Sequence, residues 1–253
     1  KECDWSSDVC SSDLKKERRI MKMKKSLVFG ILLSICMTIP TMADTSNSGI
    51  VIEPISSLQE QLEEMTEEQK VIAIEKYYSV EDEKIVETRA SWYQLGGFYM
   101  PQQSAQNNCV AACCYATMRW LTGIEVPMGA LFGGGAASLS QAQSYLNSAQ
   151  SANVYVAMSS TVSLDAMKAN FYTAIAGHNA PPIISATMST ADGWPYALNA
   201  HAMCITGITS DRGMVMVADS YIPWVNGSAS TQYVMPSTSV KSAIARRGIG
   251  YIF

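Results

Sequence analysis

The chain has 253 residues, with 18 Lys and Arg against 22 Asp and Glu, a formal net charge of −4 and two histidines. This balance excludes the concentrated cationic face that nucleic-acid-binding proteins present. Because His178 and His201 are the only imidazoles and no Cys-x-x-Cys pair occurs, the sequence also argues against a zinc site, and no cofactor is predicted.

The first segment in chain order, residues 1–20, resembles a translated sequencing adapter rather than protein. A signal peptide should begin near the true start of a protein, and such a peptide follows directly. We therefore predict Met21 or Met23 as the initiator and leave the preceding residues out of the functional interpretation.

Residues 21–43 follow the pattern of a signal peptide, with a lysine-rich start, an apolar stretch over 26–39 and a small-residue exit at Ala43. The apolar stretch is too short to span a bilayer comfortably. We expect a secreted, extracellular protein with no membrane association after cleavage. Lipid attachment at Cys36 is the alternative, although Ile35 stands where a lipoprotein site requires a small residue.

Residues 44–90 form an acidic segment with 12 Asp and Glu against 4 Lys and Arg. Within it, Ser56–Tyr78 shows helical spacing of apolar residues after a serine cap. We interpret the segment as a propeptide that is released near Arg89 or Ala90. The alternative is a solvated helix that stays packed on the following domain.

Residues 91–253 are poor in charge and predict an α+β domain, in which a helical layer packs on an antiparallel sheet. Helices are expected over 109–121, 138–147, 163–176 and 237–245. Strands are expected over 154–158, 183–188, 202–208, 214–218, 232–234 and 250–253.

Cys109 opens the first of these helices and is the candidate nucleophile. A thiol attacks a carbonyl only as the thiolate, and the positive end of a helix favours that anion. Asn107 and Asn108 precede Cys109 and are good capping residues, so we expect them to place the thiol in the first helical turn. Cys113 lies four residues later and is predicted to be buried filler.

Three further residues complete the predicted catalytic set. His201 would activate the thiol and protonate the leaving amine, and Asp219 would accept the other ring N–H. Gln103 would donate its amide N–H to the developing oxyanion, together with the backbone N–H of Cys109. Cys109, His201 and Asp219 each have an ordinary structural explanation when taken alone, whereas the four residues in this order favour catalysis. The competitors His178 and Asp211 both lie in predicted turns.

The runs Gln103-x5-Cys-Val-Ala-Ala-Cys, His201-Ala-Met-Cys-Ile-Thr-Gly-Ile and Val217-Ala-Asp-Ser-Tyr look like the bacterial papain-like peptidases of the C39-like and AvrRpt2-like groups. The resemblance covers about residues 93–253. It implies a papain-like fold, no metal, and peptide-bond cleavage through an acyl-enzyme. Val110 replaces the Trp or Gly of those groups, and Asp219-Ser-Tyr stands for the Asn-Ser-Trp of papain.

The sequence thus predicts a secreted bacterial cysteine peptidase that acts on a peptide or protein substrate. An amidase or transamidase acting on cell-wall or protein substrates is one alternative, because an amine as well as water can resolve an acyl-enzyme. A non-catalytic secreted binding module is another. Four aromatic residues are candidate walls of the substrate cleft: Trp194, Tyr196, Tyr221 and Trp224.

Overall fold

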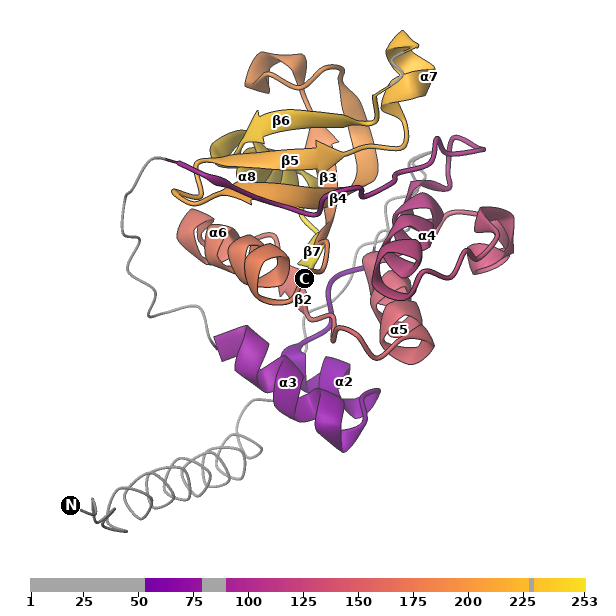
Figure 1. Cartoon of the computed structure of the whole chain (residues 1–253), viewed down its shortest axis with the longest axis vertical. Helices are drawn as coiled ribbons and strands as arrows, with labels where there is room; N and C mark the ends of the chain where they lie inside the picture. Colours follow the sequence, from indigo (N-terminus) through magenta and orange to yellow (C-terminus); the bar gives the residue numbers. More distant parts are fainter. Residues whose placement is uncertain (1–52, 79–89, 228–229) are drawn as a thin grey trace, which may run out of the picture. The chain divides into compact units, whose positions relative to one another are not determined.

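An antiparallel sheet organises the part of the chain that the computed structural model describes, residues 53–78, 90–227 and 230–253 (Figure 1). Its strands are β1 (Trp92–Gln94), β2 (Ala157–Ser159), β3 (Ile183–Met188), β4 (Leu198–Thr209), β5 (Met214–Ala218), β6 (Gln232–Pro236) and β7 (Gly250–Ile252). They follow the order β2-β7-β3-β4-β5-β6, and β1 pairs with β4. Each of these neighbouring pairs is antiparallel.

Helices accompany this sheet, which confirms the predicted α+β class. They are α2 (Leu58–Glu63), α3 (Glu67–Tyr78), α4 (Cys109–Thr122), α5 (Leu139–Ala149), α6 (Leu164–Tyr172), α7 (Ile222–Asn226) and α8 (Ser237–Arg247). Helix α4 packs against β4 and α5, while α8 packs on β3 (Figure 1). Strand β4 is therefore in contact with the helix that carries Cys109.

The ends of α4 show why this helix forms where the sequence predicts it. It begins at Cys109, runs through buried alanines and cysteines, and ends at Gly123, whose φ of 73° suits a residue without a side chain. Ser138 caps α5 by accepting a hydrogen bond from the N–H of Gln141, whose side chain bonds back to the Ser138 N–H.

Several predicted boundaries are wrong. The helix expected over 56–78 is two helices, broken between α2 and α3, and the strand expected over 154–158 occupies Ala157–Ser159. The helix expected over 163–176 ends at Tyr172 and continues as a short π-helix, Thr173–Gly177. Strand β1, helix α7 and the 3-10 helix Thr190–Asp192 were not predicted, and neither was the 3-10 segment Met128–Gly134, which is kinked at residues 131–133.

Helices α2 and α3 are joined to the rest of the domain by buried polar contacts. The Gln61 side chain accepts a hydrogen bond from the Ala157 N–H at 2.8 Å and donates to the Ala157 carbonyl at 3.1 Å, so it extends β2 as a strand neighbour would. Gln143 of α5 also donates to Gln61. These contacts fit the alternative in which the helical segment stays packed, and release near Arg89 or Ala90 remains a prediction.

Lys76 of α3 is the most deeply buried charged group in this junction, with 3 % of its surface exposed. Its ammonium donates to Asn153 Oδ1 at 3.0 Å and to the carbonyls of Val154 and Phe253 at 2.8 and 3.0 Å. Burial lowers the pKa of Lys76 to about 7. The buried Lys76 ammonium therefore connects the segment 53–78 to Val154 and to the C-terminal residue Phe253 through hydrogen bonds.

We expect Lys76→Ala to lower the free energy of unfolding by about 2–4 kcal/mol, because three acceptors lose their shared donor and the buried stem leaves a cavity. Chemical denaturation at neutral pH measures the effect. Lys70→Ala is the matched control, since Lys70 lies on the same helix and forms a more exposed pair with Glu67. Equal stability of the two variants would contradict this view of the junction.

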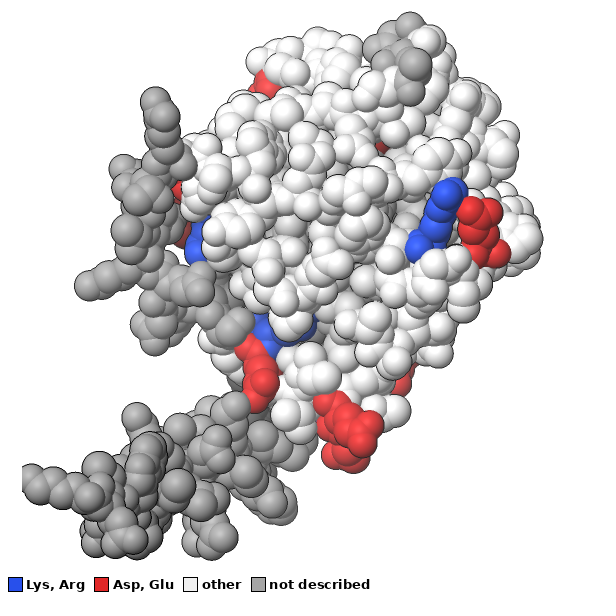
Figure 2. Space-filling model, viewed as in Figure 1, with Lys and Arg blue, Asp and Glu red and all other residues white. Residues whose placement is uncertain are grey.

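Few charged side chains are visible on the face of the described residues that Figure 2 shows. In the view of Figure 2 the Lys and Arg side chains lie apart from one another and do not merge into a patch. None of the helices described is long and apolar enough to cross a membrane. The adapter-like stretch, the signal peptide with Cys36, and Arg89 of the proposed processing point fall outside the described residues, whereas Ala90 is described and exposed.

Candidate active site

Cys109 is the first residue of α4 and is 1 % exposed. Asn108 occupies the N-cap position, but the prediction that its side chain caps the helix is wrong. Its Oδ1 instead accepts a hydrogen bond from the Ala105 N–H, and its Nδ2 donates to Ser104 Oγ. The Asn108 side chain therefore stabilises the loop before α4. It does not occupy the N-terminal end of the helix, whose partial positive charge can act on the Cys109 thiol.

The hairpin of β4 and β5 brings His201 and Asp219 together. His201 lies in the first half of β4, opposite Ala186 of β3. Asp219 directly follows β5, whose last residue, Ala218, pairs with Cys204 of β4. The distance from His201 Nε2 to Asp219 Oδ1 is 2.7 Å, and the two side chains are 2 % and 0 % exposed. The predicted histidine–carboxylate pair is thus present in the fold.

Charge and hydrogen bonding set the protonation of this pair. Burial lowers the pKa of His201, but the charge of Asp219 and hydrogen bonds with Asp219 and Cys109 outweigh burial and raise it to about 10. Burial raises the pKa of Asp219, but the charge of His201 and its hydrogen bonds bring it below the usual value. We conclude that an imidazolium faces a carboxylate at neutral pH.

The ring of His201 connects Asp219 to Cys109. Because Nε2 is bonded to Asp219, the other ring nitrogen, Nδ1, is the one available for the hydrogen bond with the Cys109 sulfur. An imidazole held between a carboxylate and a thiol can stabilise the thiolate and later deliver a proton. The structure therefore brings the three predicted residues into one chain of contacts.

Gln103 lies in the same buried region, but its amide is already engaged. Its Nε2 donates to the carbonyls of Ala105 and Gln106 at 2.9 and 3.2 Å, and its Oε1 accepts from Ser220 Oγ at 2.8 Å. The Gln103 N–H also donates to the Ser220 carbonyl. Gln103 thus ties the loop before Cys109 to the residue after Asp219, and its oxyanion role stays a prediction.

The competing residues lie where the turn interpretation placed them. His178 is exposed at the end of the π-helix, and desolvation of its ring and the charge of Lys76 lower its pKa. Asp211 accepts hydrogen bonds from the Gly213 N–H and the Thr209 hydroxyl inside its own turn. Neither of these two residues has a hydrogen bond to Asp219 or His201 among those described.

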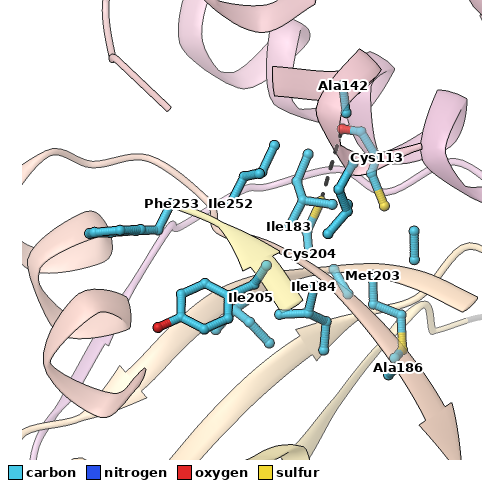
Figure 3. Close-up of a cluster of buried hydrophobic side chains, with 14 of the residues drawn as sticks. Cys113, Ala142, Ile183, Ile184, Ala186, Met203, Cys204, Ile205, Ile252 and Phe253 are labelled. Atoms are coloured by element: carbon cyan, nitrogen blue, oxygen red, sulfur yellow. Dashed lines mark hydrogen bonds between the residues drawn. The ribbon is translucent and has the colours of Figure 1, made fainter. Parts of the chain in front are cut away.

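The other described cysteines belong to the core rather than to the site. Cys113, Cys114 and Cys204 are buried free thiols. Figure 3 shows Cys204 pointing toward the carbonyl of Cys113, with a sulfur–oxygen distance of 3.9 Å, among side chains of β3, β4 and β7. Burial and the neighbouring thiols raise the pKa values of Cys113 and Cys114 well above the usual range. They are therefore poor nucleophiles.

Aromatic residues close the site around Asp219, and the sequence indicated only part of this arrangement. The Tyr196 hydroxyl donates to Asp219 Oδ2 at 2.6 Å and the Tyr233 hydroxyl donates to the same oxygen at 2.9 Å. Tyr221 lies against the His201 ring, with 5.8 Å between centroids, and Trp224 stacks on Tyr221. Tyr233 was not predicted, because nothing in its strand distinguishes it from a packing residue.

No family model matches the chain, and no curated protein matches it closely enough to count as a relative. No group of three or more His, Cys, Asp or Glu among the described residues could hold a metal ion.

Proposed function

We propose that the chain is a secreted bacterial cysteine peptidase with a papain-like fold, in which Cys109, His201 and Asp219 form the catalytic triad. One observation carries the proposal: the buried imidazole of His201 is bonded to Asp219 at 2.7 Å through Nε2 and also bonds to Cys109, at the start of α4. The antiparallel sheet with a helix in contact with β4 fits the architecture that the C39-like and AvrRpt2-like resemblance implies.

The reaction that this geometry supports has two stages. In the first stage, the Cys109 sulfur forms a bond to the carbonyl carbon of the substrate while the C–N bond breaks. His201 transfers its proton to the departing amine, which leaves an acyl-enzyme. In the second stage, His201 takes a proton from water as the water oxygen attacks the acyl carbon, and the sulfur departs. Asp219 keeps the ring in one orientation throughout.

Burial of the triad strengthens this assignment. Within a site that excludes water, charges act on each other more strongly than they do at a surface. The carboxylate of Asp219 is fully buried, yet it is matched by the imidazolium and by further donors. Removing either partner of such a buried pair would leave the other charge uncompensated.

The test is a search for cleaved bonds with the full chain as it is secreted. We expect digestion of casein with new peptide N-termini identified by mass spectrometry, and loss of this digestion after treatment with iodoacetamide. Release of muropeptides without casein digestion would favour the amidase or transamidase alternative. An absence of both activities, together with a thiol at position 109 that does not react, would leave the binding-module alternative and overturn the proposal.

A further inference from the structure

We infer that Tyr196 and Tyr233 are positioning residues of the triad, which hold the Asp219 carboxylate ionised and fixed in the orientation that faces His201. The inference rests on the proposed function and extends it to two residues that touch neither Cys109 nor His201 through the hydrogen bonds described.

The carboxylate of Asp219 is divided between two pairs of donors. Oδ1 accepts from His201 Nε2 at 2.7 Å and from the Tyr221 N–H at 2.8 Å. Oδ2 accepts from the hydroxyls of Tyr196 at 2.6 Å and Tyr233 at 2.9 Å. Because each oxygen has its own donors, rotation of the carboxylate would break contacts on both sides. The hydrogen bonds of the two tyrosine hydroxyls to Oδ2 therefore keep Oδ1 directed toward His201.

The two hydroxyls come from separate parts of the chain, the loop before β4 and strand β6, and the rings of both tyrosines are packed. Tyr196 precedes β4 and packs against the ring of Tyr221 at 5.6 Å between centroids. Tyr233 lies in β6, where it pairs with Val217 of β5, and its ring meets Trp194 at 6.3 Å in an edge arrangement. Sheet pairing and ring packing thus hold the two hydroxyls in place independently of their hydrogen bonds to Asp219.

The tyrosine hydroxyls replace hydrogen bonds from water that the Asp219 carboxylate loses on burial. Burial raises the pKa of a carboxyl group, whereas hydrogen bonds donated to the charged form lower it. Burial together with the charge of Asp219 raises the pKa values of Tyr196 and Tyr233 above their usual range, so both remain protonated donors. The charge and hydrogen bond of His201 make the largest contribution to keeping Asp219 ionised, and the neutral tyrosine hydroxyls add their hydrogen bonds on Oδ2.

Other groups that titrate or carry charge also face the triad. Tyr221 comes from the start of α7 with its ring against His201, and Cys109 comes from α4. Arg247 at the end of α8 acts electrostatically on Cys109. None of these three groups has a described hydrogen bond to Asp219 Oδ2, which accepts from the hydroxyls of Tyr196 and Tyr233.

The test compares Tyr196→Phe, Tyr233→Phe and the double variant in the full chain. Each single variant keeps one donor on Oδ2, so we expect kcat/KM at neutral pH to fall by about threefold, while the double variant loses about thirtyfold or more. Without either donor the carboxylate protonates more readily, so the acid limb of the kcat/KM profile should move to higher pH by about one unit.

The matched control is Tyr251→Phe, which removes another buried hydroxyl, one that accepts a hydrogen bond from Asn170 at 2.8 Å. This variant should lose stability without any movement of the acid limb. If the double variant keeps the wild-type acid limb, or if the Tyr251 control moves it equally, the inference is wrong.

A second readout separates this inference from the proposed function. The rate at which iodoacetamide alkylates Cys109 as a function of pH requires no substrate. If the wild-type chain cleaves no substrate, the proposed function fails, yet the alkylation profile still tests the tyrosines. We expect the double variant to lose alkylation at acidic pH before the wild-type chain does, and identical profiles would overturn the inference.

Discussion

Replacing Cys109 with alanine is expected to lower kcat/KM for peptide cleavage by at least about 10⁴-fold, because the variant has no atom that can form the acyl-enzyme. The side chain is small and lies at the start of α4, so the fold should survive the change. Steady-state assays with a cleaved peptide, together with a denaturation curve for the variant, measure the two effects separately.

Cys113→Ala is the control for the Cys109 variant. Cys113 is buried on the same helix, and burial followed by its contact with Cys204 raises the pKa of its thiol well above the usual range. We expect its loss to leave kcat/KM within about twofold of wild type, with a modest cost in stability. Full activity in both single variants would remove Cys109 from the mechanism.

Asp219→Ala should have the second largest effect. His201 Nε2 and the hydroxyls of Tyr196 and Tyr233 would all lose their acceptor in a buried site. We expect kcat/KM to fall by about 10²–10⁴-fold and the free energy of unfolding to fall by about 3–5 kcal/mol. Kinetics measured well below the unfolding temperature separate the loss of catalysis from the loss of structure.

Asp219→Asn provides the graded comparison for this prediction. The amide keeps an oxygen that can accept from His201 or the Tyr221 N–H, but it carries no charge to stabilise the imidazolium. Its activity should lie between wild type and the alanine variant. An alanine variant as active as wild type would show that the carboxylate does not orient the ring.

The sequence predicts those parts of the fold that local rules control. The start of α4 at Cys109 and its end at Gly123 follow from an apolar stretch and a glycine, and β3 and β5 have the bounds expected from their apolar residues. Cys109, His201 and Asp219 were predicted as a group because their order and residue types match one reaction. The structure places them in contact.

The remainder depends on pairings between distant segments. Strand β1 consists of three exposed residues that pair with residues 207–209, more than a hundred positions later in the chain. The pairing is close, since a side chain at Gly207 would meet the Tyr93 carbonyl oxygen. Tyr233 reaches Asp219 only because β6 pairs with β5. The Asn108 side chain bonds within the loop instead of capping α4, and such competition between two local bonds leaves no signal in the residue type.

The most direct test is to identify, by mass spectrometry, the thiol that a thiol-directed peptidase inhibitor modifies at about pH 5.5, where an ordinary thiol is mostly protonated. The wild-type chain should carry one adduct at Cys109, and His201→Ala should carry none under the same conditions. Unmodified Cys109 in the wild-type chain, or equal labelling of the two proteins, would contradict the claim that His201 activates this thiol.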